Sequence, residues 1–194
     1  MNILAIDSTT DRLVVCAEID GAFFQKKSGE DVKRHNGLIV PYVDDVLAQA
    51  GAKIAEIDVF AAVCGPGSFT GIRVGVATAK AFALALGKPV VAVDALALVG
   101  YGKKGDFITA IDARNDNFYA AMFCGDCTNT VWEKSVTKTE LLSYNVSVTY
   151  QTTPVNGRDL IALAKYRAEK GLFESNLSPV YLKKSQAERM KDGE

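Results

Sequence analysis

The sequence predicts an α/β protein made of two related lobes, each with a mixed sheet flanked by helices. Three features lead to this fold class. The chain opens with three strand-like segments in succession, then alternates helix and strand, and its second half starts with a copy of the first strand and turn. We expect residues 1–97 to form the first lobe and residues 98–194 the second, which ends in a polar tail.

The first half begins with an antiparallel meander. Apolar and β-branched residues predict strands over Asn2–Asp7, Leu13–Ile19 and Ala22–Lys27, and Asp20-Gly21 is a hairpin signal between the last two. Apolar residues at helical spacing then predict a helix over Gly37–Ala50.

A β–α–β unit completes the first half. Val59–Cys64 is short and fully apolar, which is typical of a buried parallel strand. A glycine-rich turn leads to a long helix over Ser68–Leu86, which ends at Gly87 and is followed by a buried strand over Val90–Val93.

The same signals predict the elements of the second half. Strands are expected at residues 107–112, 118–124, 130–136 and 146–150, and helices at residues 137–143 and from 156 or 157 to 169.

An internal repeat relates the two halves. In each copy a strand ends at an aspartate, a polar turn follows, and an apolar strand leads away. The matching positions are Ile3, Ala5, Ile6, Asp7 and Asp11 in the first copy and Ile108, Ala110, Ile111, Asp112 and Asp116 in the second.

A duplicated domain of this layout resembles the actin, hexokinase and Hsp70 group, so we expect the actin-like ATPase (ASKHA, ribonuclease H-like) fold. In working members each half lends one hairpin turn to clamp nucleotide phosphates, which takes a carboxylate for Mg²⁺ and small or hydroxyl residues. The first turn has this chemistry in Asp7, Ser8, Thr9 and Thr10, whereas the second has an alanine and an arginine in place of the hydroxyls. The alternative is that both aspartates cap their own turns.

The most specific segment is the turn between the strand at 59–64 and the long helix. Its glycines permit a tight connection, and its serine can cap the helix. No Gly-Lys-Ser/Thr closes it, so it is not a Walker A loop. Its glycine spacing, followed by Asp94, leaves a dinucleotide-binding loop as one alternative. The turn consists of Gly65, Pro66, Gly67, Ser68, Phe69 and Thr70.

This turn, extended to Gly75, closely resembles the signature of the TsaB (YeaZ) family, as do the opening Ile-Leu-Ala-Ile-Asp-Ser-Thr, the middle Ile-Asp-Ala-Arg and the late Pro179–Leu182. The resemblance implies a non-catalytic subunit required for threonylcarbamoyl transfer to adenosine in ANN-decoding tRNAs. It implies a TsaD-like catalytic partner, a TsaE-like P-loop ATPase, contact with tRNA through the complex, and a homodimer when the chain is alone. It also implies no cofactor of the chain's own, with ATP or ADP bound by the complex.

No metal site is expected. The TsaD family, as the resemblance implies, holds metal with two histidines at H-x-x-x-H spacing on a helix, but His35 is the single histidine here. Cys124 and Cys127 form a C-x-x-C without two further zinc ligands, in a segment expected to be a hairpin turn rather than the start of a helix.

The long helix carries a candidate partner surface. Gly71, Gly75, Ala79 and Ala83 recur every four residues and share one face, on which another helix can approach closely. The alternative is tight packing of this face on the protein's own sheet or preceding helix. Together with Arg73, and with Val43 and Leu47 of the preceding helix, these residues form the expected interface.

Composition sets the remaining expectations. The net charge of −1 argues against a stand-alone nucleic-acid binder, which normally shows a basic field. Neither a signal peptide nor a membrane-length apolar stretch is evident, so a cytoplasmic location is expected. Two other functions stay open: an active ASKHA-type ATPase or kinase, and a dinucleotide-dependent oxidoreductase that uses the Gly65–Gly71 loop.

Overall fold

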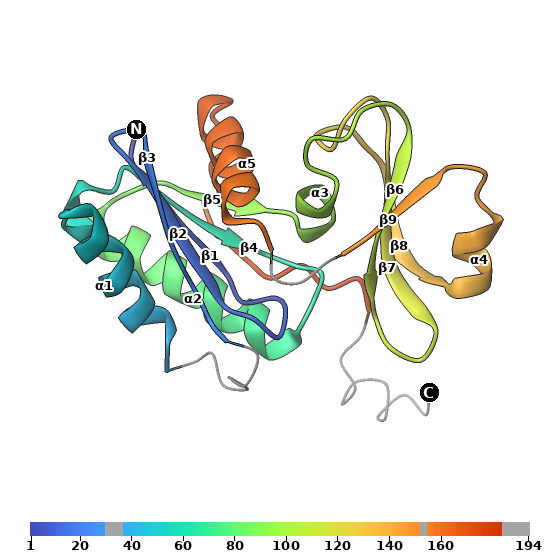
Figure 1. Ribbon diagram of the computed structural model, residues 1–194, viewed down its shortest axis with the longest axis horizontal. Helices are drawn as coiled ribbons and strands as arrows, with labels where there is room; N and C mark the ends of the chain where they lie inside the picture. Colours follow the sequence, from blue (N-terminus) through green and yellow to red (C-terminus); the bar gives the residue numbers. More distant parts are fainter. Residues whose placement is uncertain (30–36, 152–154, 184–194) are drawn as a thin grey trace.

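The computed structural model describes residues 1–29, 37–151 and 155–183, and these form two sheets flanked by helices (Figure 1). The first sheet consists of β1 (Ile3–Asp7), β2 (Val14–Ile19), β3 (Ala22–Lys27), β4 (Val59–Val63) and β5 (Val90–Val93). The second consists of β6 (Phe107–Asp112), β7 (Asn117–Phe123), β8 (Thr130–Thr137) and β9 (Ser147–Tyr150). Every expected strand is present, with bounds shifted by one residue at most.

The first sheet has the strand order β3-β2-β1-β4-β5. The meander β1–β3 is antiparallel, and β4 and β5 continue the sheet in the parallel sense, with Ile3 opposite Glu18 on one side and Val59 on the other. β1 and β4 are buried along their whole length, because each has strands on both sides and helices on both faces.

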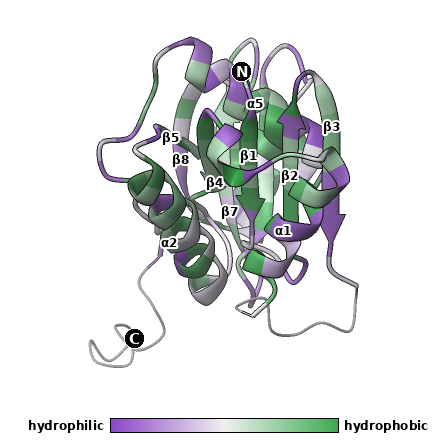
Figure 2. Cartoon of the chain, turned by 90° about the vertical axis from the view of Figure 1, so that its left-hand side faces the viewer, coloured by the Kyte–Doolittle hydropathy of each residue, from purple (hydrophilic) through white to green (hydrophobic). Residues whose placement is uncertain are grey.

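Helices cover both faces of this sheet. α1 (Ile39–Ala50) and α2 (Phe69–Leu86) share one hydrophobic core on one face, and α5 (Gly157–Glu169) packs against β1, β2 and β5 on the other (Figures 1 and 2). α5 comes from the second half of the sequence. The expected second lobe of residues 98–194 is therefore too long, because its final helix buries its apolar side on the first sheet.

The second sheet has the order β8-β7-β6-β9, which repeats the first four positions of the first sheet. α4 (Lys138–Ser143) takes the place of α1 between the third and fourth strands, and Thr137 caps it by accepting a hydrogen bond from the Glu140 N–H. This correspondence supports the internal repeat. The second sheet has no equivalent of β5 among the described residues.

Two short helices were not expected from the sequence: the 3₁₀ helix η1 (Ile54–Glu56) and α3 (Ala95–Val99). α3 leaves the first sheet after β5 and packs against β6 and β7 of the second. The expected lobe boundary at residues 97 and 98 falls inside this helix, so α3 is the junction between the lobes.

One hydrophobic core runs through both lobes. It includes inward residues of β1, β4 and β5, one side of α3 and α5, and the face of the second sheet that carries Phe107, Tyr119 and Phe123. Phe107 and Phe123 stack with ring centroids 5.3 Å apart. A second core lies under α1 and α2, and a small third core lies under α4.

The sequence was expected to contain no apolar segment of membrane-spanning length, and α2 shows that this expectation was wrong. Its 18 residues are long and apolar enough, by length and composition, to cross a membrane, yet it lies on the first sheet and only a third of its residues are buried there. In Figure 2 hydrophobic colour covers much of α2. α2 thus leaves apolar residues exposed as well as buried.

We predict that both lobes unfold in one transition, because they share one core. Trp132, the single tryptophan, reports on the second sheet, and far-ultraviolet circular dichroism reports on the whole chain. The two urea curves of the wild type should coincide. Phe123→Ala should shift both curves together, by about 3–5 kcal/mol. Two separate transitions would contradict the shared core.

Candidate functional site

The turn after β1 uses its polar groups internally. The Asp7 carboxylate accepts hydrogen bonds from the Thr9 N–H at 2.8 Å and from the Thr9 hydroxyl at 2.7 Å. The Ser8 hydroxyl donates to the Gly71 carbonyl oxygen at 2.7 Å. Asp7, Ser8 and Thr9 are all buried, at 0%, 1% and 3% exposure. Thr10 is half-buried and bonds to the backbone of Arg12. This is the self-capped turn that was the alternative to phosphate binding.

The turn after β6 repeats the geometry on the surface. The Asp112 carboxylate accepts a hydrogen bond from the Arg114 N–H at 2.8 Å, at the same two-residue spacing as in the first turn. Arg114, Asn115 and Asp116 all have positive φ and are exposed. Both copies of the repeat therefore cap their own backbones.

The start of α2 closes over the first turn, and glycines permit the contact. A Cβ at Gly67 would lie 2.6 Å from the Thr9 carbonyl oxygen. A Cβ at Gly71 would overlap the Ser8 carbonyl oxygen, and one at Gly75 would overlap the Ser8 hydroxyl. Real Cβ atoms essentially never come so close, so these positions need glycine for close packing within the chain.

The same packing buries the small residues that recur every four positions along α2. Gly71, Gly75, Ala79 and Ala83 are all buried on the first sheet. Val43 and Leu47, on the buried side of α1, lie in the same core. These six residues are therefore unavailable to a partner in the folded chain, and their assignment to the partner surface is corrected. The close approach that this spacing indicates is therefore the packing of α2 on the protein's own first sheet.

Arg73 is the one predicted interface residue that lies on the surface. Its Nε–H donates to the Tyr181 hydroxyl at 2.8 Å, and its guanidinium lies 5.6 Å from the centre of the Tyr181 ring. Spacing by four residues continues from it to Ala77, Ala81 and Ala85, which are exposed. We call Arg73, Ala77, Ala81, Leu84 and Ala85 the outer stripe of α2.

The signature turn is also covered by the C-terminal segment Leu177–Leu182. The Val180 N–H donates to the Cys64 carbonyl oxygen at 2.8 Å. Gly65 has φ of 116°, and a Cβ there would lie 2.6 Å from the Val180 carbonyl oxygen. Tyr181 stacks on Phe69 with centroids 4.7 Å apart and an interplanar angle of 8°. Figure 1 shows this red segment passing between the lobes.

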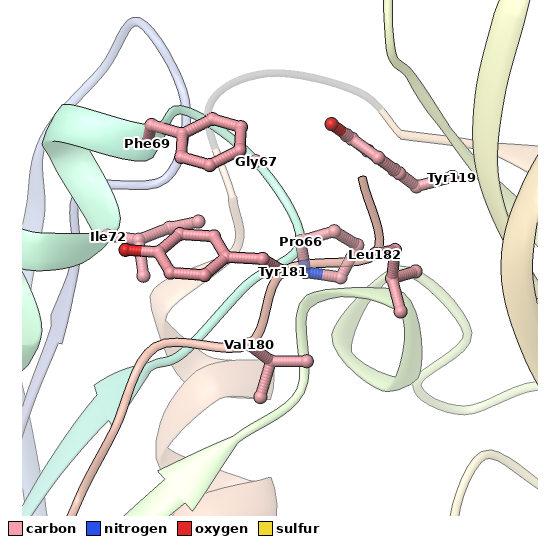
Figure 3. A pocket seen from close by; sticks show the side chains of 8 residues that line it. All are labelled: Pro66, Gly67, Phe69, Ile72, Tyr119, Val180, Tyr181 and Leu182. Carbon is pink, nitrogen blue, oxygen red and sulfur yellow. The ribbon is translucent and has the colours of Figure 1, made fainter. Parts of the chain in front are cut away.

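Between the segment, the signature turn and the second sheet lies a narrow crevice (Figure 3). It has no room for a water-sized ligand. Its lining residues are Pro66, Gly67, Phe69, Ile72, Tyr119, Val180, Tyr181 and Leu182. Sequence reasoning did not single out Tyr119 or Tyr181 as site residues, although the motif Pro179–Leu182 pointed to the segment.

The helix starts around the site have different caps. Ser68 caps α2 as expected, accepting from the Gly71 N–H at 3.3 Å. Asp94 caps α3, accepting from the Ala97 N–H at 2.6 Å. The chain's own Thr9 and Val180 backbones occupy the close approaches to Gly67 and Gly65 that a pyrophosphate would need. The geometry therefore gives no support to a dinucleotide loop.

The surroundings of the cysteines favour a structural role over a reactive one. Cys124 and Cys127 lie in the turn between β7 and β8, where the Cys124 N–H donates to the Asn129 carbonyl oxygen. Burial, and then the charge of Asp126, raises the pKa of the Cys127 thiol, which disfavours a reactive thiolate. Burial raises the pKa of Cys16 as well, with the charge of Asp7 adding to it. The described residues contain no group of three metal-ligand side chains, and His35 lies outside them.

Comparison with known proteins gives a consistent set of relatives. The family model described as TsaD: tRNA N6-adenosine threonylcarbamoyltransferase matches residues 30–187. The tRNA threonylcarbamoyladenosine biosynthesis protein TsaB of Escherichia coli K12 is 35% identical over 149 residues, which are 73% of this chain and 62% of that protein. An uncharacterized protein of Mycobacterium tuberculosis H37Rv is 35% identical over 124 residues, 63% of this chain and 59% of its own length. The chain thus spans about three fifths of these curated relatives.

A solved structure supports the fold. YeaZ from Pseudomonas aeruginosa superposes with a TM-score of 0.79 at 24% identity, over 93% of this chain and 99% of that one. This agreement over nearly all of both chains confirms the expected α/β fold with two mixed sheets flanked by helices.

We predict that the glycine contact is essential for stability. Gly71→Ala should destabilise the protein by about 3 kcal/mol or more, because its Cβ overlaps backbone that cannot move aside. The matched control is Gly37→Ala, where no atom lies within 4 Å of the added Cβ, and its effect should stay within about 0.5 kcal/mol. Urea denaturation measures both, and equal small effects would refute the contact.

Proposed function

The chain belongs to the TsaB (YeaZ) family, and from that membership we propose that it takes part in tRNA threonylcarbamoyladenosine biosynthesis as a non-catalytic subunit. In this role it binds and supports a TsaD-like subunit that carries the catalytic site. A TsaE-like P-loop ATPase completes the complex in the cytoplasm, and tRNA and any ATP or ADP are bound by the complex as a whole. Alone, the chain pairs with a second copy.

The burial of the first turn carries the non-catalytic part of this proposal. A phosphate turn must present backbone N–H groups and a carboxylate to its ligand. Here the Thr9 N–H is bonded to Asp7, the Ser8 hydroxyl is bonded to Gly71, and all of these residues are buried. The side of the turn toward α2 is filled by the helix itself.

The outer stripe of α2 supports the partner role. Leu84 is 81% exposed, and the exposed alanines beside it leave an apolar strip, bordered by the exposed Lys80, on which another helix can lie closely. α1 adds Val40, which is half exposed, to the same layer. Arg73 at the start of the stripe is oriented by its hydrogen bond to Tyr181, which suits it to a partner carboxylate.

A reconstitution experiment tests the proposal. Leu84→Asp should weaken binding of the TsaD-like protein from the same organism at least about tenfold, because a carboxylate would be buried unpaired in the interface. Leu142→Asp on α4, where the leucine is 65% exposed in the second lobe, is the matched control and should bind like the wild type. Analytical ultracentrifugation measures both affinities.

The binding results and an activity assay of the pure chain test separate parts of the proposal. Loss of binding in Leu84→Asp alone, with unchanged thermal unfolding, supports the outer stripe as the partner surface. Equal binding by both variants would rule out the stripe, and threonylcarbamoyl transfer or ATP turnover by the pure chain would rule out the non-catalytic role.

A further inference from the structure

The residues that follow α5 are fixed to the first lobe at successive points. The Glu174 N–H donates to the carbonyl oxygen of Val90, on the edge strand β5, at 2.8 Å. Leu177 is buried in the core under α1 and α2, and the Val180 N–H is bonded to the Cys64 carbonyl oxygen. Backbone and core contacts thus fix the course of the C-terminal segment, so that it can hold other side chains in place.

Side chains of this stretch contact α2 at two places along its length. The side-chain oxygen of Asn176, just before the C-terminal segment, accepts a hydrogen bond from the Lys80 ammonium group. Further along, the Tyr181 hydroxyl accepts a hydrogen bond from the Arg73 Nε–H, and the Tyr181 ring stacks on Phe69 (Figure 3). Because the residue numbers rise along the stretch while they fall along α2, the two run antiparallel.

The two side chains that these contacts hold are the charged residues of α2. The helix contains Arg73 and Lys80, and it contains neither aspartate nor glutamate. Both cations are exposed, and they lie two helical turns apart, or about 10 Å, on the side of the helix that carries Leu84. Although the net charge of the chain is −1, the outer side of α2 is therefore basic.

The contacts with the C-terminal stretch orient these cations without cancelling their charge. The acceptors are a phenol hydroxyl and a side-chain amide, which are uncharged groups. The Tyr181 ring centre also lies 5.6 Å from the Arg73 guanidinium, within the range of a cation–π contact. A long side chain that is already held loses less conformational entropy when it binds a partner. Both charges are thus prepared for an anionic ligand.

We propose that the C-terminal segment, with Asn176, forms part of the partner surface, and that it holds Arg73 and Lys80 to pair with two carboxylates about two turns apart on a helix of the TsaD-like subunit. This inference rests on the proposed function, because it takes the outer stripe of α2 as the surface that the subunit covers. Val180 and Tyr181, which are 42% and 40% exposed, extend the contact area beyond α2.

Charge explains why an acidic partner fits this surface better than a second copy of the chain does. If two copies met through their outer stripes, the basic side chains of one α2 would face those of the other, and like charges would repel. A partner helix with carboxylates at matching positions replaces this repulsion with attraction, and the two pairs also fix its register along α2.

Binding of the TsaD-like protein at low and high salt tests the charge pairing. Arg73→Gln and Lys80→Gln should each weaken binding about tenfold at low salt, and each should reduce the dependence of the affinity on salt. Lys138→Gln removes an exposed lysine of α4 in the second lobe, and it should bind like the wild type. Wild-type affinity and salt dependence in both α2 variants would overturn the pairing.

A double-mutant cycle tests the part played by the C-terminal segment. Tyr181→Phe keeps the stacked ring and removes the hydroxyl that Arg73 contacts. It should weaken binding about threefold in the wild type and have no further effect in Arg73→Gln, with unchanged thermal unfolding. Tyr150→Phe, at an exposed tyrosine of β9, is the matched control and should bind like the wild type. The same loss in both backgrounds would overturn the positioning of Arg73 by Tyr181.

The Leu84→Asp variant distinguishes failure of this inference from failure of the proposed function. If Leu84→Asp loses binding while Arg73→Gln, Lys80→Gln and Tyr181→Phe bind normally, the outer stripe is the partner surface and the C-terminal segment has no part in it. If Leu84→Asp binds normally as well, the subunit does not cover this side of α2, and both the stripe and the segment are rejected as its binding surface.

Discussion

The fold depends on the contact between the glycines at the start of α2 and the turn after β1. Because Gly67, Gly71 and Gly75 have no side chains, the helix lies directly on the backbone of Ser8 and Thr9. The Ser8 hydroxyl in this turn donates a hydrogen bond to the Gly71 carbonyl oxygen. Gly65, which precedes the helix, lies directly against the backbone of the C-terminal segment. One strand-to-helix connection thus fixes α2, the first turn and the end of the described chain relative to one another.

Because of this contact, the residues that resemble a phosphate-binding turn have a structural role. A carboxylate, two hydroxyls and a run of glycines are present, but they bond to and pack against one another. The second copy of the turn has the same self-capped geometry on the surface. The polar groups of both turns thus serve internal structure, which suits the supporting role proposed above.

Local patterns made the strands, the long helices and the repeat predictable, because each element has its own apolar periodicity and its own turn or cap residues. The orientation of α2 was not predictable in this way. Small residues every four positions show that one face is approached closely, but they do not show whether a sheet or a partner approaches it. α3 has five residues, too few for a periodic signal, so the helix at the lobe junction was not predicted although the boundary was placed within it. Tyr181 meets Phe69 across more than a hundred residues, a contact that no local pattern encodes.

If the first turn serves packing, this chain alone should not bind nucleotide there. Isothermal titration of the purified protein with Mg·ATP measures this. We expect no saturable heat at millimolar nucleotide, with the protein shown to be folded in the same sample. Saturable binding in the micromolar range that is lost in Asp7→Asn would contradict it.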